Sequence, residues 1–157
     1  MPDNDPIFGR LDRFDHAILD VLAKDGRIPV TELSRIVGLS KSPCQVRVKR
    51  LQAEGYILGF RALLDPAKLG QDHVAFVEVK LTDTTEGALE AFNAAVMKVP
   101  EIEECHMIAG SFDYLLKIRT GGIRAYRQVL GKTVSTLPYV GNTSTHVSMQ
   151  AIKDSAF

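Results

Sequence analysis

The feature of this sequence that most suggests chemistry is a concentration of positive charge in one short stretch. Residues 27–61 carry seven basic side chains against two acidic ones, whereas the 157-residue chain as a whole balances nineteen basic against nineteen acidic residues. Clustered lysine and arginine neutralise phosphates and release the counterions condensed on nucleic acid. The stretch therefore predicts a nucleic-acid-binding segment, and a merely solvated helix face is the alternative that charge alone leaves open.

Most of these basic residues fall on one expected helix, over residues 41–54. Cys44, Val48 and Leu51 recur at i, i+4 and i+7 and predict its buried side. Pro43 is tolerated because it falls in the first turn, where its missing N–H would have no partner. The remaining positions give this helix a polar, cationic outer side, with a shape that fits the major groove of B-DNA.

The residues expected to meet DNA belong to this helix and to its cap. We expect Lys41, Ser42 and Gln45 nearest the base edges, because N-terminal residues of a recognition helix reach the bases. The cations further along are expected on the phosphate backbone. The full predicted set is Ser40, Lys41, Ser42, Gln45, Arg47, Lys49 and Arg50.

Two shorter helices are expected to position the cationic one. Residues 11–23 carry apolar side chains at intervals of three and four residues, which predicts an amphipathic helix. Asp12 is its expected N-cap, and Asp15 lies in its first turn. A second helix over residues 30–37 is expected to bury Leu33, Ile36 and Val37. The tight turn that follows consists of Gly38, Leu39 and the capping residue Ser40. This arrangement is typical of a helix-turn-helix unit that reads DNA, and a plain three-helix packing domain is the alternative.

After the third helix, Tyr56, Leu58 and Phe60 alternate with the residues between them, and this two-residue period predicts a trailing strand over residues 56–61. The Asp65-Pro66 pair then ends the apolar run, and residues 62–72 are expected to form a hinge. The sequence thus divides into a DNA-binding domain, residues 1–61, and a second domain, residues 73–157.

The second domain shows the element order strand, helix, strand, strand, helix, strand. The expected strands are residues 73–81, 101–108, 112–119 and 140–150, with helices before Pro100 and after Gly122. This is the ferredoxin-like βαββαβ plan, so the fold class is α+β with an N-terminal winged-type helix-turn-helix. Both helices cover one face of such a sheet. We expect the other face to be apolar and to be hidden by dimerisation.

The motifs of both halves resemble those of the Lrp/AsnC ("feast or famine") family of transcription regulators. The resemblance covers residues 11–152 and lies in LDRFDHAILDVLAKDGR, ELSRIVGLS, CQVRVKRLQAEGYILGFRALLDP, ECHMIAGSFDYLLKIR and AYRQVLG. It implies a regulator that binds double-stranded DNA and senses an amino acid, and that forms homodimers assembling into octamers or similar rings. A non-specific architectural protein that wraps DNA is the alternative function.

The resemblance also implies that the effector binds around the loop between the second and third strands of the second domain. Carried onto this sequence, the effector residues are His106, Met107, Ala109, Gly110, Ser111, Asp113 and Tyr114. The turn at 109–111 offers N–H groups for a carboxylate, and Asp113 or Ser111 is expected to receive an ammonium. An ordinary β-turn capped by Asp113 is the alternative.

Leucine and proline are the two ligands that the resemblance favours. The leucine-responsive branch of the family carries an acidic residue at the position of Ser111, and this departure weakens the case for leucine. The second half is at least as similar to the branch that activates proline dehydrogenase genes. Pro29 is another departure, because it replaces the serine that usually caps the second helix.

Other chemistry is not indicated. The four histidines lack metal-ligand spacing, the two cysteines suit neither a disulfide framework nor a four-thiolate zinc site, and no catalytic or phosphate-binding motif appears. We therefore expect no enzyme activity, metal or cofactor. The apolar runs are too short to span a bilayer, and the acidic N-terminus does not resemble a signal peptide, so we expect a cytoplasmic location.

Overall fold

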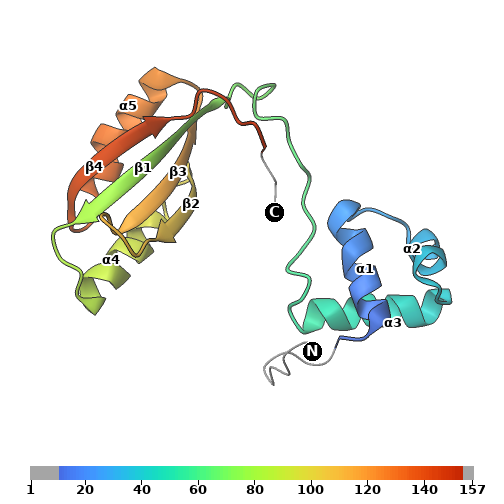
Figure 1. Ribbon diagram of the computed structural model, residues 1–157. Helices are drawn as coiled ribbons and strands as arrows, with labels where there is room; N and C mark the ends of the chain where they lie inside the picture. Colours follow the sequence, from blue (N-terminus) through green and yellow to red (C-terminus); the bar gives the residue numbers. More distant parts are fainter. Residues whose placement is uncertain (1–10, 154–157) are drawn as a thin grey trace. The chain divides into compact units, whose positions relative to one another are not determined.

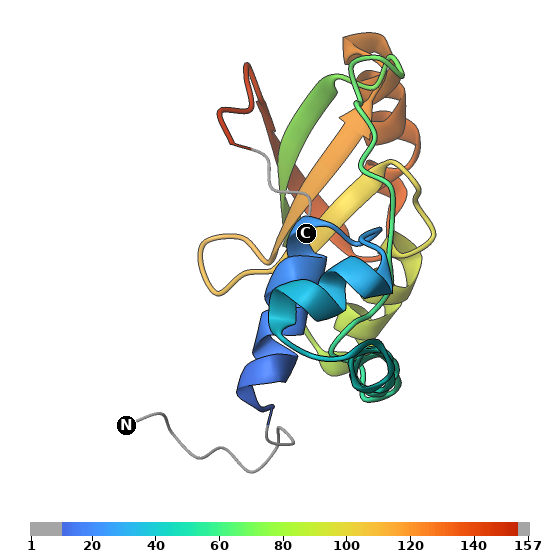
Figure 2. The same ribbon diagram turned by 90° about the vertical axis from the view of Figure 1, so that its right-hand side faces the viewer.

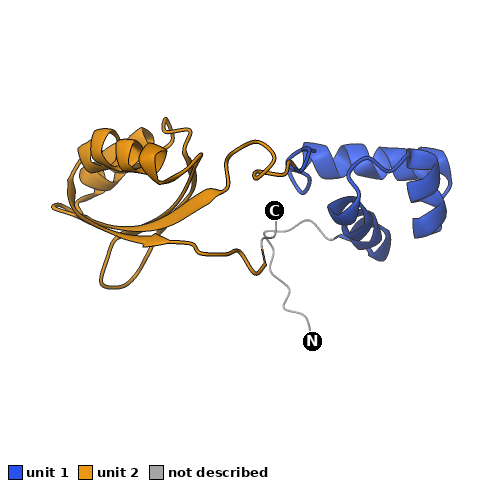
Figure 3. Ribbon diagram, turned by 90° about the horizontal axis from the view of Figure 1, so that it is seen from above, with its two compact units in different colours: residues 1–63 blue, residues 64–157 orange. Residues whose placement is uncertain are grey.

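Two separate apolar cores organise the chain, one in each of two compact units. The computed structural model describes residues 11–153, so the acidic N-terminal residues 1–10 lie outside the described range. Unit 1 extends to Leu63, and unit 2 begins at Leu64 (Figure 3).

Unit 1 is a bundle of three helices, whose packing can be followed in Figure 2. They are α1 (Arg13–Lys24), α2 (Val30–Val37) and α3 (Lys41–Ala53). These bounds confirm the three predicted helices to within two residues. Ile18 from α1, Leu33 from α2, and Cys44 and Leu51 from α3 form the fully buried centre, since all four are at most 2% exposed.

The start of α1 is a reciprocal capping box. The Asp12 carboxylate accepts hydrogen bonds from the N–H groups of Phe14 and Asp15, both at 2.9 Å, and Asp15 accepts one from the Asp12 N–H at 3.0 Å. These bonds satisfy N–H groups that an α-helix leaves unpaired at its first turn. The predicted N-cap is confirmed.

The turn between α2 and α3 depends on Gly38, whose φ of +74° lies in the left-handed region that glycine adopts without strain. Ser40 precedes α3 in an extended conformation, but its hydroxyl makes no capping hydrogen bond, unlike the prediction. The predicted burial of Ile36 is also wrong, because this side chain is 50% exposed. At about 100° per residue, Ile36 lies roughly 60° to one side of Leu33 and Val37 roughly 40° to the other, so Ile36 is at the edge of the buried side of α2.

The predicted strand over residues 56–61 is wrong. Within the described chain, this segment pairs with no other strand, and the backbone from 54 to 72 forms turns and extended coil. Tyr56 and Ile57 instead pack against the core of unit 1, and the Ile57 N–H donates to the Leu51 carbonyl at 3.1 Å. Alternation of apolar residues favours a strand only where a neighbouring strand accepts its hydrogen bonds.

Unit 2 is a four-stranded antiparallel sheet with its helices on one side (Figure 1). The elements are β1 (His73–Leu81), α4 (Glu86–Val96), β2 (Ile102–Met107), β3 (Tyr114–Thr120), α5 (Ile123–Lys132), a 3₁₀ turn η1 (Val134–Thr136) and β4 (Val140–Val147). The sheet order is β2-β3-β1-β4. The predicted βαββαβ plan is confirmed, and the 3₁₀ turn was not predicted.

The helices cover the apolar face of the sheet. Every second residue along each strand points toward this face, and most of these residues are apolar. Val77 from β1 and Leu116 from β3 are fully buried on this face, together with Phe92 from α4 and Tyr126 from α5. Figure 3 shows both helices of unit 2 on the same side of the sheet. Among residues 11–153, every helix is too short or too polar to serve as a transmembrane span.

The other face of the sheet is mainly polar, with several charged side chains, which corrects the expectation of an apolar face. The strand register places Glu104, Lys117, Phe76 and His146 in one row across the four strands. Lys117 pairs with Glu104 at 3.0 Å. Alternation directs most of the β-branched and leucine residues of these strands toward the helices, and the intervening positions are mainly polar.

Candidate functional site

The outward side of α3 presents a polar, cationic surface. Cys44 and Leu51 point into the core of unit 1, whereas Lys41, Ser42, Gln45 and Lys49 are exposed. Lys41 and Lys49 make no ion pair with any of residues 11–153. The predicted DNA-facing side of α3 is thus exposed at these positions, and Ser40 is exposed at the start of the helix.

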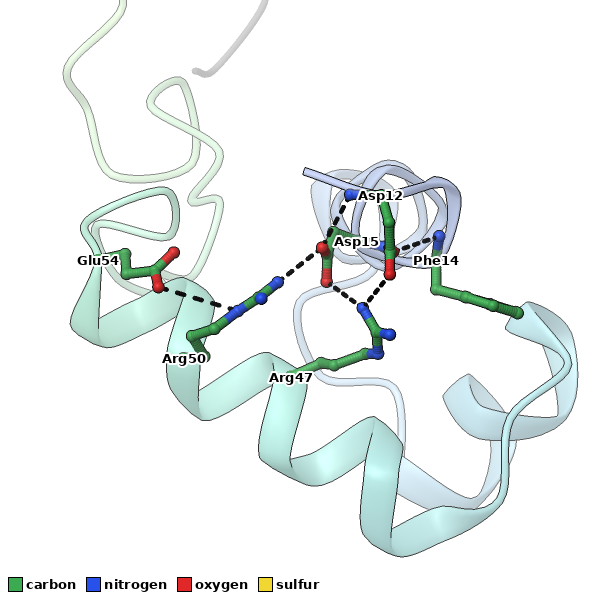
Figure 4. Close-up of polar contacts among 6 residues, drawn as sticks. All are labelled: Asp12, Phe14, Asp15, Arg47, Arg50 and Glu54. Atoms are coloured by element: carbon green, nitrogen blue, oxygen red, sulfur yellow. Dashed lines mark hydrogen bonds and ion pairs between the residues drawn. The ribbon is translucent and has the colours of Figure 1, made fainter. Parts of the chain in front are cut away.

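The two arginines of α3 lie differently from the sequence prediction. Figure 4 shows both guanidinium groups directed from α3 toward Asp15 on α1. Arg47 Nη1 lies 2.8 Å from Asp15 Oδ1 and 2.7 Å from Asp12 Oδ2. Arg50 Nη2 lies 2.6 Å from Asp15 Oδ2, so one carboxylate binds both arginines. We name Asp15, Arg47 and Arg50 the α1–α3 clamp.

The carboxylate of Asp15 is held ionised inside unit 1, where it is 1% exposed. Burial raises the pKa of this carboxyl, but the hydrogen bonds from the Asp12 N–H, Arg47 and Arg50 outweigh it and lower the pKa to about 2. The guanidinium of Arg47 also lies over the Phe14 ring, 5.5 Å from its centroid. These contacts fix the position of α3 relative to α1.

The sequence contained a signal for the clamp that the charge pattern alone did not reveal. Asp15 lies at i+4 from Leu11 and at i−3 from Ile18, on the apolar stripe of α1. An acidic residue on a buried stripe needs a cation or hydrogen-bond donors from a neighbouring helix. Arg47 and Arg50 lie three residues apart, so they face the same neighbour.

The loop between β2 and β3 is tied to the end of β1 by Asp113. One carboxylate oxygen of Asp113 accepts from the Leu81 N–H at 2.7 Å, and the other lies 3.0 Å from Lys80 Nζ. The Asp113 N–H donates to the Val79 carbonyl, and the Ile108 N–H donates to the Asp113 carbonyl, both at 2.9 Å. The bond from Leu81 and the charge of Lys80 lower the pKa of Asp113 despite its partial burial.

The remaining predicted effector residues divide into exposed and buried. His106, Ala109, Gly110 and Ser111 are exposed, and Met107 is 57% exposed.

Tyr114, in contrast, lies in the core, where its ring centroid is 4.4 Å from that of Phe92. The side chain of Tyr114 is therefore directed into the core and is not exposed on the loop. Tyr114, Leu116 and Ile118 alternate along β3 toward the helices, and this pattern was visible in the sequence.

Within the described chain, the titratable side chains form no group of three or more histidine, cysteine, aspartate or glutamate residues suited to a metal ion. Burial raises the pKa of both thiols, Cys44 in the core of unit 1 and Cys105 on β2. Neither environment favours the thiolate that a reactive cysteine needs.

A three-helix unit with an exposed cationic helix, joined to a ferredoxin-like unit, defines a DNA-binding regulator with a separate ligand-binding domain. Comparison with protein families supports both parts. Residues 11–57 match a winged helix-turn-helix DNA-binding domain, and residues 74–156 match the Lrp/AsnC ligand binding domain. The chain belongs to the Lrp/AsnC family, whose members are transcriptional regulators and not enzymes.

Named relatives match over nearly the whole chain. The proline dehydrogenase transcriptional activator of Rhizobium radiobacter is 65% identical over 144 residues, which cover 92% of each chain. The leucine-responsive regulatory protein of Salmonella typhimurium is 50% identical over 145 residues, or 92% of this chain and 88% of the relative.

Solved structures agree with the fold. A transcriptional regulator of Neisseria meningitidis, determined as a complex with L-methionine, superposes with a TM-score of 0.87 at 33% identity, covering 94% of this chain and 95% of that one. An AsnC family regulator from Agrobacterium tumefaciens gives a TM-score of 0.88 at 30% identity with the same coverage.

Proposed function

We propose that this regulator reads DNA with the outward side of α3 and responds to proline bound at the β2–β3 loop. The observation that carries the DNA assignment is a contrast between two pairs of basic residues on α3. Lys41 and Lys49 project without an ion pair among residues 11–153, whereas Arg47 and Arg50 bind Asp15.

The contrast changes which residues we assign to DNA. Lys41, Ser42 and Gln45 are proposed to face base edges and the phosphates beside them, because they project from the first half of the helix. Lys49 is proposed to bind a phosphate. Ser40 would place its N–H or hydroxyl near the backbone at the start of the helix.

Arg47 and Arg50 are proposed to act mainly by holding α3 in place. Each guanidinium has more donors than the carboxylates use, so a phosphate contact in addition to the clamp is compatible with this role. Arg50 is the better placed of the two, since its side chain is 42% exposed against 26% for Arg47.

A paired substitution tests the DNA assignment. We expect Lys41→Ala combined with Lys49→Ala to weaken binding to every duplex and to lower its salt dependence, since two phosphate contacts disappear. Lys24→Ala, an exposed lysine at the end of α1, serves as the matched control and is expected to bind as the wild type does. Titration by fluorescence anisotropy at several salt concentrations measures both. Unchanged binding by the double variant would refute the assignment.

Proline is the proposed effector because two observations favour it over leucine. The relative named for activation of proline dehydrogenase shares 65% of residues, against 50% for the leucine-responsive relative. Ser111 also brings no negative charge to the exposed turn of the loop. On the same basis we propose that the regulated genes include one for proline breakdown.

The geometry of the loop supports two different roles within the proposed site, positioning of the loop and contact with the effector. The exposed turn at 109–111 offers N–H groups to a carboxylate, with Met107 and His106 beside it. Asp113, in contrast, is already bound to Leu81 and Lys80. We therefore propose that Asp113 positions the loop, and that Ser111 and the surrounding backbone contact the effector.

A thermal-shift screen over the twenty amino acids tests the effector assignment, because a ligand that binds the native state raises its melting temperature. We expect proline to give the largest rise. A Gly110→Glu variant is expected to lose that rise while keeping DNA affinity, since a bulky carboxylate would repel the ligand. A larger rise with leucine or methionine would overturn the proline assignment.

We also propose that the regulator is a homodimer that assembles further, into octamers or similar rings. A two-fold arrangement would place paired α3 helices on half-sites about 34 Å apart. Light scattering after size-exclusion chromatography measures the assembly. Competition between a preferred duplex and random DNA separates a specific regulator from a protein that only wraps DNA, because the latter would show no preference.

A further inference from the structure

One large apolar side chain lies among the polar residues on the outward side of α3. Val46 is 67% exposed, whereas Val48 on the same helix packs against the core of unit 1. At about 100° per residue, Val46 is rotated by roughly 160° from the buried Cys44. It therefore lies near the middle of the outward side, one turn after Ser42 and three residues before Lys49.

Among the described residues of unit 1, 11–63, no contact explains a valine at this position. A β-branched residue is a poorer helix former than lysine, glutamine or alanine, and leaving it in water gains no burial energy. A single exposed apolar residue is ordinary on most surfaces. Here its position matters, because its neighbours Ser42, Gln45 and Lys49 form the surface assigned above to DNA.

An apolar side chain has one natural partner in the major groove, the C5 methyl group of thymine. The other base edges present hydrogen-bonding groups: the amino group of cytosine, and N7 with O6 or N6 of the purines. Covering those groups with a valine would remove their water without replacing its hydrogen bonds. A valine in the groove therefore favours thymine and disfavours the other three bases at the position it covers.

We propose that Val46 selects a thymine in each half-site by packing its isopropyl group against the C5 methyl. This inference rests on the proposed function, since it requires α3 to lie in the major groove. Val46 recognises the methyl group, whereas Ser42 and Gln45 hydrogen-bond with neighbouring bases. The preferred DNA sequence thus contains a base whose recognition depends on one methyl group.

The test begins by selecting duplexes from a randomised library with the wild-type chain and with Val46→Ala. In the selected wild-type duplex, each thymine is then replaced in turn by deoxyuridine, which lacks only the C5 methyl. At one position in each half-site, we expect uracil to lower wild-type affinity about fourfold, since one buried methyl contact is lost. Val46→Ala is expected to bind the thymine and uracil duplexes equally at that position.

Two controls keep the result interpretable. Val46→Thr keeps the β-branched shape and one methyl, so it is expected to retain part of the preference. The melting temperature of each variant is expected to match that of the wild type, because an exposed side chain contributes little to stability.

The outcomes separate this inference from the function on which it rests. If the wild type selects no preferred sequence, DNA reading by α3 fails and the inference fails with it. If the wild type selects a sequence but no thymine shows a methyl effect that Val46→Ala removes, the role of Val46 is overturned and DNA reading by α3 stands.

Discussion

The α1–α3 clamp makes a quantitative prediction about the stability of unit 1. Replacing Asp15 with asparagine keeps the shape of the side chain and its capacity to accept the Asp12 N–H. It removes the negative charge that both Arg47 and Arg50 bind, at 2.8 and 2.6 Å respectively. The arginines remain partly exposed and regain water, so the loss is expected to be moderate.

The size of the effect follows from the pKa of Asp15, which is about 2 in the folded chain against 3.8 for an ordinary aspartate. One pKa unit corresponds to about 1.4 kcal/mol, so all contacts of the Asp15 carboxylate, including the Asp12 N–H bond, together contribute on the order of 2 kcal/mol at neutral pH, and the two arginines contribute part of it. Because the folded pKa is the lower one, this stability is present above about pH 4. It is lost as the pH falls toward the folded pKa of about 2.

Hydrogen exchange followed by mass spectrometry measures this effect on peptides of α1 and α3 in the full chain. At pH 7 we expect Asp15→Asn to exchange faster than the wild type, by an amount equivalent to at most about 2 kcal/mol, because asparagine keeps the bond to the Asp12 N–H. Unfolding followed by circular dichroism between pH 2 and pH 7 then gives the pH dependence. The difference between variant and wild type is expected to shrink below about pH 4.

Asp20→Asn is the matched control, because Asp20 lies on the exposed side of the same helix. It removes the same charge and is expected to change stability by less than about 0.5 kcal/mol. Equal stability of Asp15→Asn and the wild type at pH 7, or a difference that persists unchanged at pH 2, would refute the assigned role of the clamp.

Three further predictions concern single positions. Lys49→Ala is expected to reduce the slope of log affinity against log salt by about one, measured by anisotropy with a fixed duplex; an unchanged slope would remove Lys49 from the phosphate contacts. Gly38→Ala is expected to cost about 1 kcal/mol in denaturant unfolding, because alanine is strained at a φ of +74°. The same change at Gly87, within α4, is expected to be stabilising. Asp113→Asn is expected to speed hydrogen exchange in the β2–β3 loop, because the charge that binds Lys80 is lost; exchange at the wild-type rate would contradict its positioning role.

The elements of both units were predictable because their apolar residues recur with the period of the structure they form. The helix over residues 30–37 was predicted with its observed bounds, as was the strand His73–Leu81. Gly38 marked the turn that separates α2 from α3. Element order was enough to predict the ferredoxin-like sheet, since its topology depends on which segments are strands and which are helices.

The errors arise where a residue's environment depends on a segment distant in sequence. The alternation over residues 56–61 indicated a strand, but no segment of the described chain pairs with it. The charge on Arg47 and Arg50 was visible in the sequence, whereas their partner Asp15 lies more than thirty residues earlier. Local patterns describe which side of an element is polar, and they do not say which polar groups meet.

The candidate site was predictable to different degrees in the two units. On α3, the periodicity that buries Cys44 and Leu51 also exposes Lys41 and Gln45. Helical periodicity in the sequence was therefore enough to predict the exposed surface of this helix. The loop between β2 and β3 was suggested by family resemblance and not by local pattern. Within it, the alternation of β3 argued for a buried Tyr114, and the structure places this side chain in the core.

Base reading by α3 is tested by competition between a selected duplex and random DNA, for the wild-type chain and for a Ser42→Ala, Gln45→Ala double variant. If α3 reads base edges with these side chains, the wild type prefers the selected duplex, and the double variant loses most of that preference while still binding random DNA through its lysines. A double variant that discriminates as well as the wild type would contradict the claim that this side of α3 reads the sequence.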